Sequence, residues 1–550
     1  MQRGGGVLMH IASLPGPFGI GVFGEEAVAF AKQLQKQGMK YWQVLPFTYP
    51  GMGNSPYQSF SAFAGNWLFL DPRRLMKRGL LTSEEVVNSE YKENKWRIDY
   101  DYIRQQRTGL LKSAFSRADE NILNEVDEFL KKNKWADEVA VFQTIKDDND
   151  GRPWWEWSDE ALKDHDEKAV KKVRESEGYK FHAFVQYLFD SEWAEIKKEI
   201  NECGISIIGD MPIYVSADSA DVWGARDMFK MASPAKAKKL MKEYEKALAD
   251  SEKNKANVEA VQSNHISDGQ VYEPAKVAVR PPKPEALVLD KVAGVPPDYF
   301  SADGQLWGNP IYDWKKHKES GYLWWLSRIE ESYKLYDFLR IDHFRGFCSY
   351  WEVEANADTA RVGEWVKGPG LDLFEKIDQK FGGRERLIAE DLGERTPDLD
   401  EFLDKTGIPG MRVMEFAFNP GDDSSFMPHN FNKNCVAYTG THDNNTLLGW
   451  LWDAPEYVRN CCLEYCGFEG DNWGEGGTHS RSCRAIIKTL WMSHADVAII
   501  PIQDMLGYGS DTRMNIPGTP TGNWVVRFSH EDLDSIDDDW YRNLNRIYFR

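Results

Sequence analysis

The strongest constraint on the fold is a repeated alternation of short apolar runs and helical patterns along the 550 residues. Each apolar run is rich in β-branched or aromatic residues, as buried strands are. Eight such runs occur, at 7–13, 41–47, 204–215, 338–344, 386–393, 410–418, 435–444 and 497–505. Because right-handed crossovers place helices outside a parallel sheet, eight strand–helix units predict a (β/α)8 TIM barrel of the α/β class.

Local capping signals support helices between these strands. A helical pattern near 25–37 stops at Gly38, which suits the left-handed residue that ends many helices. Thr396 is predicted to cap a helix that starts at Pro397 and stops before Gly407. A further helical pattern at 481–493 precedes the last strand.

The chain is about twice as long as a bare barrel, which needs ~250 residues. We therefore expect one catalytic barrel over 1–550 with large, mostly helical insertions. One is predicted at 72–203, between the second and third strands, and another at 216–337, between the third and fourth. The second includes a charged excursion at 228–290, whose polar, helix-prone part at 232–262 is interpreted as a solvated helix rather than a partner-binding element.

Charge and cysteine usage limit the partners. The net charge of -20 disfavours nucleic acid, because phosphate backbones need a basic surface. No apolar run approaches the ~18 residues of a membrane helix, and no signal-peptide pattern is present. Cys461, Cys462 and Cys466 lack the paired spacing of zinc ribbons, so we expect reduced thiols, no metal or other cofactor, and a cytoplasmic location.

The stretch FLRIDHFRGF, residues 338–347, places charged groups at the end of a predicted strand. Side chains alternate across a strand, so Leu339 and Ile341 should face the outer helices while Arg340 and Asp342 face the barrel axis. There Arg340 would donate to Asp342 and favour its ionised form, as a nucleophile requires. A purely structural ion pair is the alternative.

The same alternation in RLIAEDLG turns Glu390, rather than Asp391, towards the axis. No arginine stands two residues before Glu390, so apolar surroundings would keep it protonated, as a general acid requires. Asp210, His442 and Asp443 end other predicted strands. Several acids at one end of a barrel match the chemistry of glycosidic bonds, although sequence spacing leaves both retention and inversion of configuration open.

Aromatic residues make up 13% of the chain, and several stand beside polar groups, as in PWWEW at 153–157 and GQLWGNP at 304–310. Flat apolar rings edged by hydrogen-bonding groups suit sugars, whose faces carry C–H bonds and whose rims carry hydroxyls. Ordinary packing remains the simpler interpretation of any single ring.

Eight motifs together resemble those of the 4-α-glucanotransferases (amylomaltases or disproportionating enzymes) of glycoside hydrolase family 77, within the α-amylase superfamily. The motifs are HIASLPGPFGIG, LPFTYPGMGNSPYQSFSAFAGN, IIGDMPIYV, GVPPDYFSADGQLWGNPIYDW, LRIDHFRGF, IAEDLG, YTGTHDNNT and MNIPGTPTGNW. They extend from residue 10 to residue 524 and so cover nearly the whole chain.

The resemblance implies a retaining, two-step transfer of glucan segments to the 4-hydroxyl of an acceptor. Asp342 would be the nucleophile, Glu390 the acid and base, and Asp443 the stabilising acid. The implied substrates are maltooligosaccharides and linear α-1,4-glucans, bound by a monomer or homodimer. The implied substrate-binding residues are Ser55, Tyr57, Asp210, Gln305, Trp307, Arg340, His343, His442 and Asn515. The loop at 294–310 is the expected cover of the acceptor site.

Two features depart from the family pattern: the length and charge of the excursion at 228–290, and Met52 where some relatives carry an aromatic residue. Three other functions remain open: an α-glucan hydrolase on the same barrel, a glucan-binding protein without turnover, and a metal-dependent barrel enzyme. The first would share the same three carboxylates, because water and a sugar hydroxyl attack the same intermediate.

Overall fold

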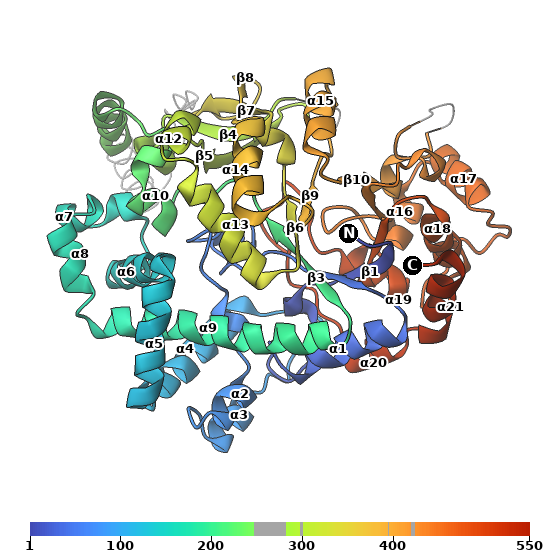
Figure 1. Cartoon of the computed structure of the whole chain (residues 1–550), viewed down its shortest axis with the longest axis horizontal. Helices are drawn as coiled ribbons and strands as arrows, with labels where there is room; N and C mark the ends of the chain where they lie inside the picture. The colour runs from blue at the N-terminus through green and yellow to red at the C-terminus, as the bar shows by residue number, and fades with distance from the viewer. Residues whose placement is uncertain (247–281, 298–300, 394, 420–423) are drawn as a thin grey trace, which may run out of the picture.

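A computed structural model describes residues 1–246, 282–297, 301–393, 395–419 and 424–550. Eight strands form one parallel sheet in the order β10-β11-β12-β1-β2-β3-β6-β9, and helices surround it (Figure 1). The strands are β1 (Gly4–Leu8), β2 (Tyr41–Gln43), β3 (Ser206–Met211), β6 (Phe338–Ile341), β9 (Leu387–Ala389), β10 (Gly410–Val413), β11 (Cys435–Tyr438) and β12 (Val497–Pro501). The predicted (β/α)8 barrel is confirmed.

The barrel is nearly closed. β1 pairs with β12 from Gly4↔Val497 to Leu8↔Pro501. At the remaining seam the Ala389 N–H donates to the Pro409 carbonyl at 2.9 Å, which links β9 to the residue before β10. This bond brings the two end strands of the sheet, β9 and β10, together, so the barrel is nearly closed.

The first strand begins earlier than predicted. It starts at Gly4 rather than residue 7, and Ile11–Ser13, predicted as strand, form a short 3-10 helix. Glycine is required in this strand because a Cβ on Gly6 would stand 2.8 Å from the backbone oxygen of Tyr41 on β2. The glycines therefore allow β1 and Tyr41 to pack closely.

Helices on the outside of the barrel are α1 (Glu25–Lys36), α13 (Leu323–Leu335), α14 (Leu371–Phe381), α15 (Pro397–Thr406), α16 (Leu447–Asp453), α17 (Glu456–Tyr465), α18 (Arg481–Met492), α19 (Ile502–Leu506), α20 (His530–Asp534) and α21 (Asp538–Tyr548). Gly38 and Gly407 have φ of +76° and +65°, as predicted for residues that end helices. The predicted side-chain cap at Thr396 is wrong: its side chain makes no capping hydrogen bond to α15.

The connection between β2 and β3 contains eight α-helices among the described residues. They are α2 (Pro72–Lys77), α3 (Ser83–Asn88), α4 (Tyr100–Ser116), α5 (Glu120–Lys132), α6 (Lys134–Asp148), α7 (Glu160–Lys163), α8 (Glu167–Val173) and α9 (Glu177–Glu202). α9 is the long helix that runs from this group to the barrel beside α1 (Figure 1). Its buried face includes Phe189, Trp193 and Ile196, so this connection shares the barrel's core.

The connection between β3 and β6 contributes part of a second sheet, which was not predicted from the sequence. β4 (Lys291–Val295) and β5 (Gln305–Pro310) join β7 (Ser349–Glu354) and β8 (Gly363–Lys367) in the antiparallel order β5-β4-β7-β8. The same connection contains α10 (Ala220–Gly224), a helix at 234–246 and α12 (Trp314–Glu319). Most of the excursion predicted at 228–290 lies outside the described residues.

All seven cysteines lie in the described part of the chain, and none forms a disulfide. Within the same part, no helix has the length and apolar character needed to cross a membrane.

Candidate active site

Arg340 and Asp342 lie at the end of β6. One terminal nitrogen of Arg340 contacts both carboxylate oxygens of Asp210, on the neighbouring strand β3, at 2.6 and 2.7 Å. The other donates to Asp342 Oδ1 at 2.9 Å, as the sequence predicted. Arg340 is 4% exposed, whereas Asp342 is 31% exposed, so the guanidinium is buried beneath a carboxylate that remains accessible.

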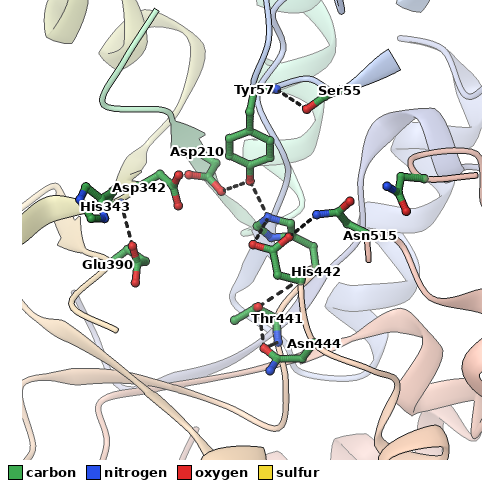
Figure 2. Close-up of polar contacts among 12 residues, drawn as sticks. Ser55, Tyr57, Asp210, Asp342, His343, Glu390, Thr441, His442, Asn444 and Asn515 are labelled. Atoms are coloured by element: carbon green, nitrogen blue, oxygen red, sulfur yellow. Dashed lines mark hydrogen bonds and ion pairs between the residues drawn. The ribbon is translucent and has the colours of Figure 1, made fainter. Parts of the chain in front are cut away.

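Glu390 follows β9 directly and is held beside the residue after Asp342. The His343 N–H donates to Glu390 Oε2 at 2.7 Å (Figure 2). The Leu392 N–H donates to Oε1 at 2.8 Å. Asp391 instead bonds to the Met411 N–H at 2.7 Å and to Arg395 at 2.6 Å. These contacts place Glu390, rather than Asp391, beside the residue that follows Asp342.

Tyr57 connects Asp210 to His442. Its hydroxyl lies 2.8 Å from Asp210 Oδ2 and 2.9 Å from His442 Nε2, and its ring stacks on the imidazole with centroids 5.3 Å apart (Figure 2). Burial, followed by the charge of Asp210, raises the pKa of Tyr57 well above its usual value. The hydroxyl therefore stays protonated and donates a hydrogen bond to Asp210. Ser55 supports this loop by accepting the Tyr57 N–H at 3.2 Å.

Asp443 follows β11 and is oriented by its neighbours while remaining 45% exposed. Asn515 Nδ2 donates to its Oδ1 at 2.6 Å, and His442 Nε2 lies 3.4 Å from its Oδ2. Arg513 donates to its backbone carbonyl at 2.6 Å. Three acids from β3, β6 and β9 and a fourth from β11 thus surround one end of the barrel, where TIM-barrel enzymes place their chemistry.

Comparison with known proteins shows the family to which this chain belongs. A sequence model of the family described as "4-alpha-glucanotransferase" matches residues 9–237 and 281–533. The 4-alpha-glucanotransferase of Streptococcus pneumoniae is 37% identical over 100% of this chain and 98% of its own length. That of Thermus thermophilus is 38% identical over 97% of this chain and 96% of its own.

The chain belongs to the 4-alpha-glucanotransferase family, glycoside hydrolase family 77. As a member it is an enzyme with 4-α-glucanotransferase activity on α-1,4-glucans. A solved structure supports the same assignment: an amylomaltase from Streptococcus agalactiae in complex with acarbose matches 100% of this chain and 99% of its own, with a TM-score of 0.86 and 36% identity.

The two carboxyls at the centre of this candidate site, Asp342 and Glu390, differ in their partners. Burial, together with the charge of Asp342, raises the pKa of Glu390 to about 8, although Arg340 and the two backbone N–H groups oppose the rise. This agrees with the protonated acid predicted from the sequence. Arg340 lowers the pKa of Asp342, as predicted, but burial, the largest cause, together with Asp210 and Asp443 raises that pKa overall.

Two predicted substrate-binding residues lie over the end of β6. The Trp307 ring, on β5, packs edge-on against the His343 imidazole with centroids 4.7 Å apart. Its Nε1 donates to Gln305 Oε1 at 3.2 Å, and Gln305 is exposed. Burial, reinforced by Arg345, lowers the pKa of His343 to about 3, which leaves a neutral imidazole under the indole. Residues 298–300 of the predicted cover loop lie outside the described residues.

Sequence reasoning missed two buried acids near the same end of the barrel. Asp504, on α19, accepts the Thr439 hydroxyl at 2.6 Å and the Leu447 N–H at 2.8 Å, and burial raises its pKa to about 7. Glu415 follows β10, and burial with the charge of Asp504 raises its pKa well above the usual value. Both acids come shortly after apolar strands, in VMEF and IIPIQD, so the strand-end pattern could have revealed them.

A small cavity of about 20 Å³, lined in part by His442, was also not predicted. It is lined in part by His10 and Ser13, and neither His10 Nδ1 nor Ser13 Oγ has a hydrogen-bond partner among the described residues. Its size suits one water molecule. In the described ranges, no group of three or more His, Cys, Asp or Glu is placed to hold a metal ion.

Proposed function

We propose that this 4-α-glucanotransferase moves segments of linear α-1,4-glucans and maltooligosaccharides to the 4-hydroxyl of an acceptor sugar by retaining double displacement. The observation that carries the proposal is the N–H of His343, the residue after Asp342, bonded to the carboxyl of Glu390 at 2.7 Å. This bond supports an arrangement in which a nucleophile and an acid act on one glycosidic bond.

In the proposed first step Asp342 attacks the anomeric carbon of the donor. Its Oδ1 receives the Arg340 N–H, so the attacking atom would be Oδ2. The C–O bond to the leaving sugar breaks as Glu390 gives its proton to that oxygen, and a covalent glucosyl–Asp342 ester forms. Arg340 holds the carboxylate without neutralising it fully, because Asp210 shares its charge.

In the proposed second step Glu390 acts as a base. The charge of Asp342 is one cause of the high pKa of Glu390, and the ester has lost that charge. The pKa of Glu390 should therefore fall once the intermediate forms, which converts the acid into a base for the incoming 4-hydroxyl. Attack by that hydroxyl breaks the ester, restores the Asp342 carboxylate and gives a product of unchanged anomeric configuration.

The remaining residues would bind sugar around these two. Asp443, His442 and Asp210 are proposed to accept or donate hydrogen bonds to donor hydroxyls, with Tyr57 as a flat platform and Asn515 orienting Asp443. Trp307 and Gln305, over His343, are proposed to hold the acceptor and reduce access of water.

The proposal also covers the organisation of the whole chain and its location. We propose a single catalytic barrel with insertions at 72–203 and 216–337, acting as a monomer or homodimer. The seven cysteines without disulfides support a reducing, cytoplasmic compartment.

Incubation with maltotriose tests the proposal. Transfer predicts a ladder of longer oligosaccharides together with glucose, resolved by anion-exchange chromatography. Shorter products alone would mean hydrolysis, the second candidate, because the same three carboxylates serve both reactions. An unchanged substrate would mean a binding protein without turnover and would overturn the proposal.

A further inference from the structure

A large hollow lies apart from the residues assigned to the catalytic site. Its volume is about 620 Å³, within the range of small-molecule sites. It is bounded by α16, by residues 507–512, by Trp96 and Arg97, and by residues 526–532. None of the substrate-binding residues proposed above lines it.

Trp452, on α16, forms a fixed aromatic surface at this hollow. It is 47% exposed, although its Nε1 donates to the Gly474 carbonyl at 3.1 Å. The ring lies against Gly509, where a Cβ would stand 2.3 Å from a ring carbon. The missing side chain at position 509 thus makes room for the indole, which is held in place and still presents apolar surface to solvent.

A second exposed indole and several polar groups complete the lining. Trp96 is 56% exposed, with Lys95 Nζ 4.8 Å from its ring centroid. The Tyr508 hydroxyl donates to Asp532, whose other oxygen accepts the Ser529 N–H at 2.7 Å. Asp511 and Arg97 add exposed charges of opposite sign. Apolar rings bordered by carboxylates and a guanidinium match the alternating C–H faces and hydroxyl rims of a neutral sugar.

The hollow is built on the two segments that hold Asp443. α16 follows the loop of Asp443 and Asn445 directly, and Asn445 Nδ2 bonds to Ser510 Oγ at 3.0 Å. The other segment, 507–512, leads to Arg513, which bonds to the Asp443 carbonyl. A ligand at this hollow would therefore be close, along both segments, to the acid that the catalytic site presents to substrate.

We propose that this hollow is a second glucan-binding site, which holds part of a long α-1,4-glucan outside the catalytic site. Trp452 and Trp96 provide stacking surfaces, and Asp511, Asp532 and Arg97 bind hydroxyls. This inference rests on the proposed function, because only a polymeric substrate can occupy the hollow and the catalytic site with one chain. Binding at both places raises the effective concentration of long substrates alone.

The first test compares substrates of different length. Trp452→Ala should lower kcat/KM for amylose by roughly 5- to 10-fold, about the value of one aromatic contact, and leave kcat/KM for maltotriose unchanged. Trp452→Phe should restore most of the activity on amylose. Tyr457→Ala removes another exposed aromatic, on the adjacent α17, and should change neither value.

Every outcome of this test either supports or overturns one of the two proposals. Equal activity of the Trp452→Ala variant and the parent on amylose would overturn the second site, as would an equal loss on maltotriose. The absence of any product ladder from the unmodified enzyme would instead refute the proposed function, so the two failures are distinguishable.

A binding measurement on an inactive variant tests the second site without catalysis. With Glu390→Gln as the background, calorimetric titration with maltoheptaose should give two binding events per chain, and adding Trp452→Ala should leave one. A single event in both proteins would overturn the proposal. If Trp452→Ala changed the sedimentation coefficient of the protein and not its glucan binding, the hollow would be an interface with a second copy of the chain, which also overturns it.

Discussion

Two buried glutamates in this molecule have similarly raised pKa values but lie in different surroundings. The pKa of Glu390, at the catalytic end of the barrel, and that of Glu192, on α9, are both raised to about 8. Burial is the main cause for each. Glu192 is 1% exposed and accepts the Asp71 N–H at 3.1 Å, so it belongs to the packing between α9 and the start of α2.

The difference lies in what surrounds each acid. Glu390 stands beside Asp342, an accessible carboxylate whose charge changes during the proposed reaction. The acid beside Glu192 is Asp71, which also raises the pKa of Glu192, but Asp71 is 1% exposed, is paired with Arg73 at 2.8 Å and takes no part in the proposed reaction. A raised pKa therefore does not by itself identify a catalytic acid. A catalytic acid is identified by its access to substrate together with a neighbouring group whose charge changes during the reaction.

The largest expected effect follows from removing that partner. Asp342→Asn should lower transfer by several orders of magnitude, because the proposed covalent step loses its nucleophile. It should also lower the pKa of Glu390 below about 8, since the charge of Asp342 is one of its causes. Isotope-edited infrared titration would measure this shift. The pKa of Glu192 serves as the internal control, and a shift of both acids, or activity within a few-fold of the parent, would contradict the assignment.

Replacing the two acids themselves separates their roles. Glu390→Gln should reduce turnover of maltotriose by roughly 10²- to 10⁴-fold, the usual contribution of a general acid. Glu192→Gln should leave turnover within about two-fold, because a glutamine keeps the acceptor for the Asp71 N–H. Steady-state kinetics at pH 6 would show the contrast. Comparable losses of turnover in the two variants would mean that Glu192 influences the active site through the packing of α9.

The smallest expected effect concerns stability against pH. The folded state raises the pKa of Glu192 to about 8 from about 4.5, so its contribution to stability is fully present below about pH 4.5 and is lost as pH rises to about 8. The cost is about 1.4 kcal/mol per pH unit across that window. The free energy of unfolding in urea should therefore fall less between pH 5 and 8 for Glu192→Gln than for the parent. Parallel curves would mean that Glu192 is ionised in the fold.

The strand periodicity predicted the barrel, and side-chain alternation placed Asp342 and Glu390 correctly at its end. Pairings between strands were beyond the same method. Arg340 bonds mainly to Asp210 because β3 and β6 are adjacent and Asp210 lies opposite Arg340. The sequence of one strand alone predicts neither its neighbour in the sheet nor its register. The sheet of β4, β5, β7 and β8 was missed for a similar reason, since its strands come from two separate connections.

The start of the first barrel strand was not predicted from the sequence because it consists of glycines. A run of three glycines resembles a loop, yet Gly4–Gly6 are the strand residues that pack against Tyr41 and β12. Their role depends on close contacts with residues far along the chain, which propensity does not report.

The pairing of β1 with β12 has a consequence for how the enzyme is made. On the ribosome, β1 emerges first and finds β2 within a few dozen residues, but its other edge receives no partner until Val497–Pro501 have been translated. At synthesis rates of about 5–20 residues per second, that edge waits for roughly half a minute or more. The nascent barrel therefore spends most of its synthesis as an open sheet, and translation of the last tenth of the chain completes its wall.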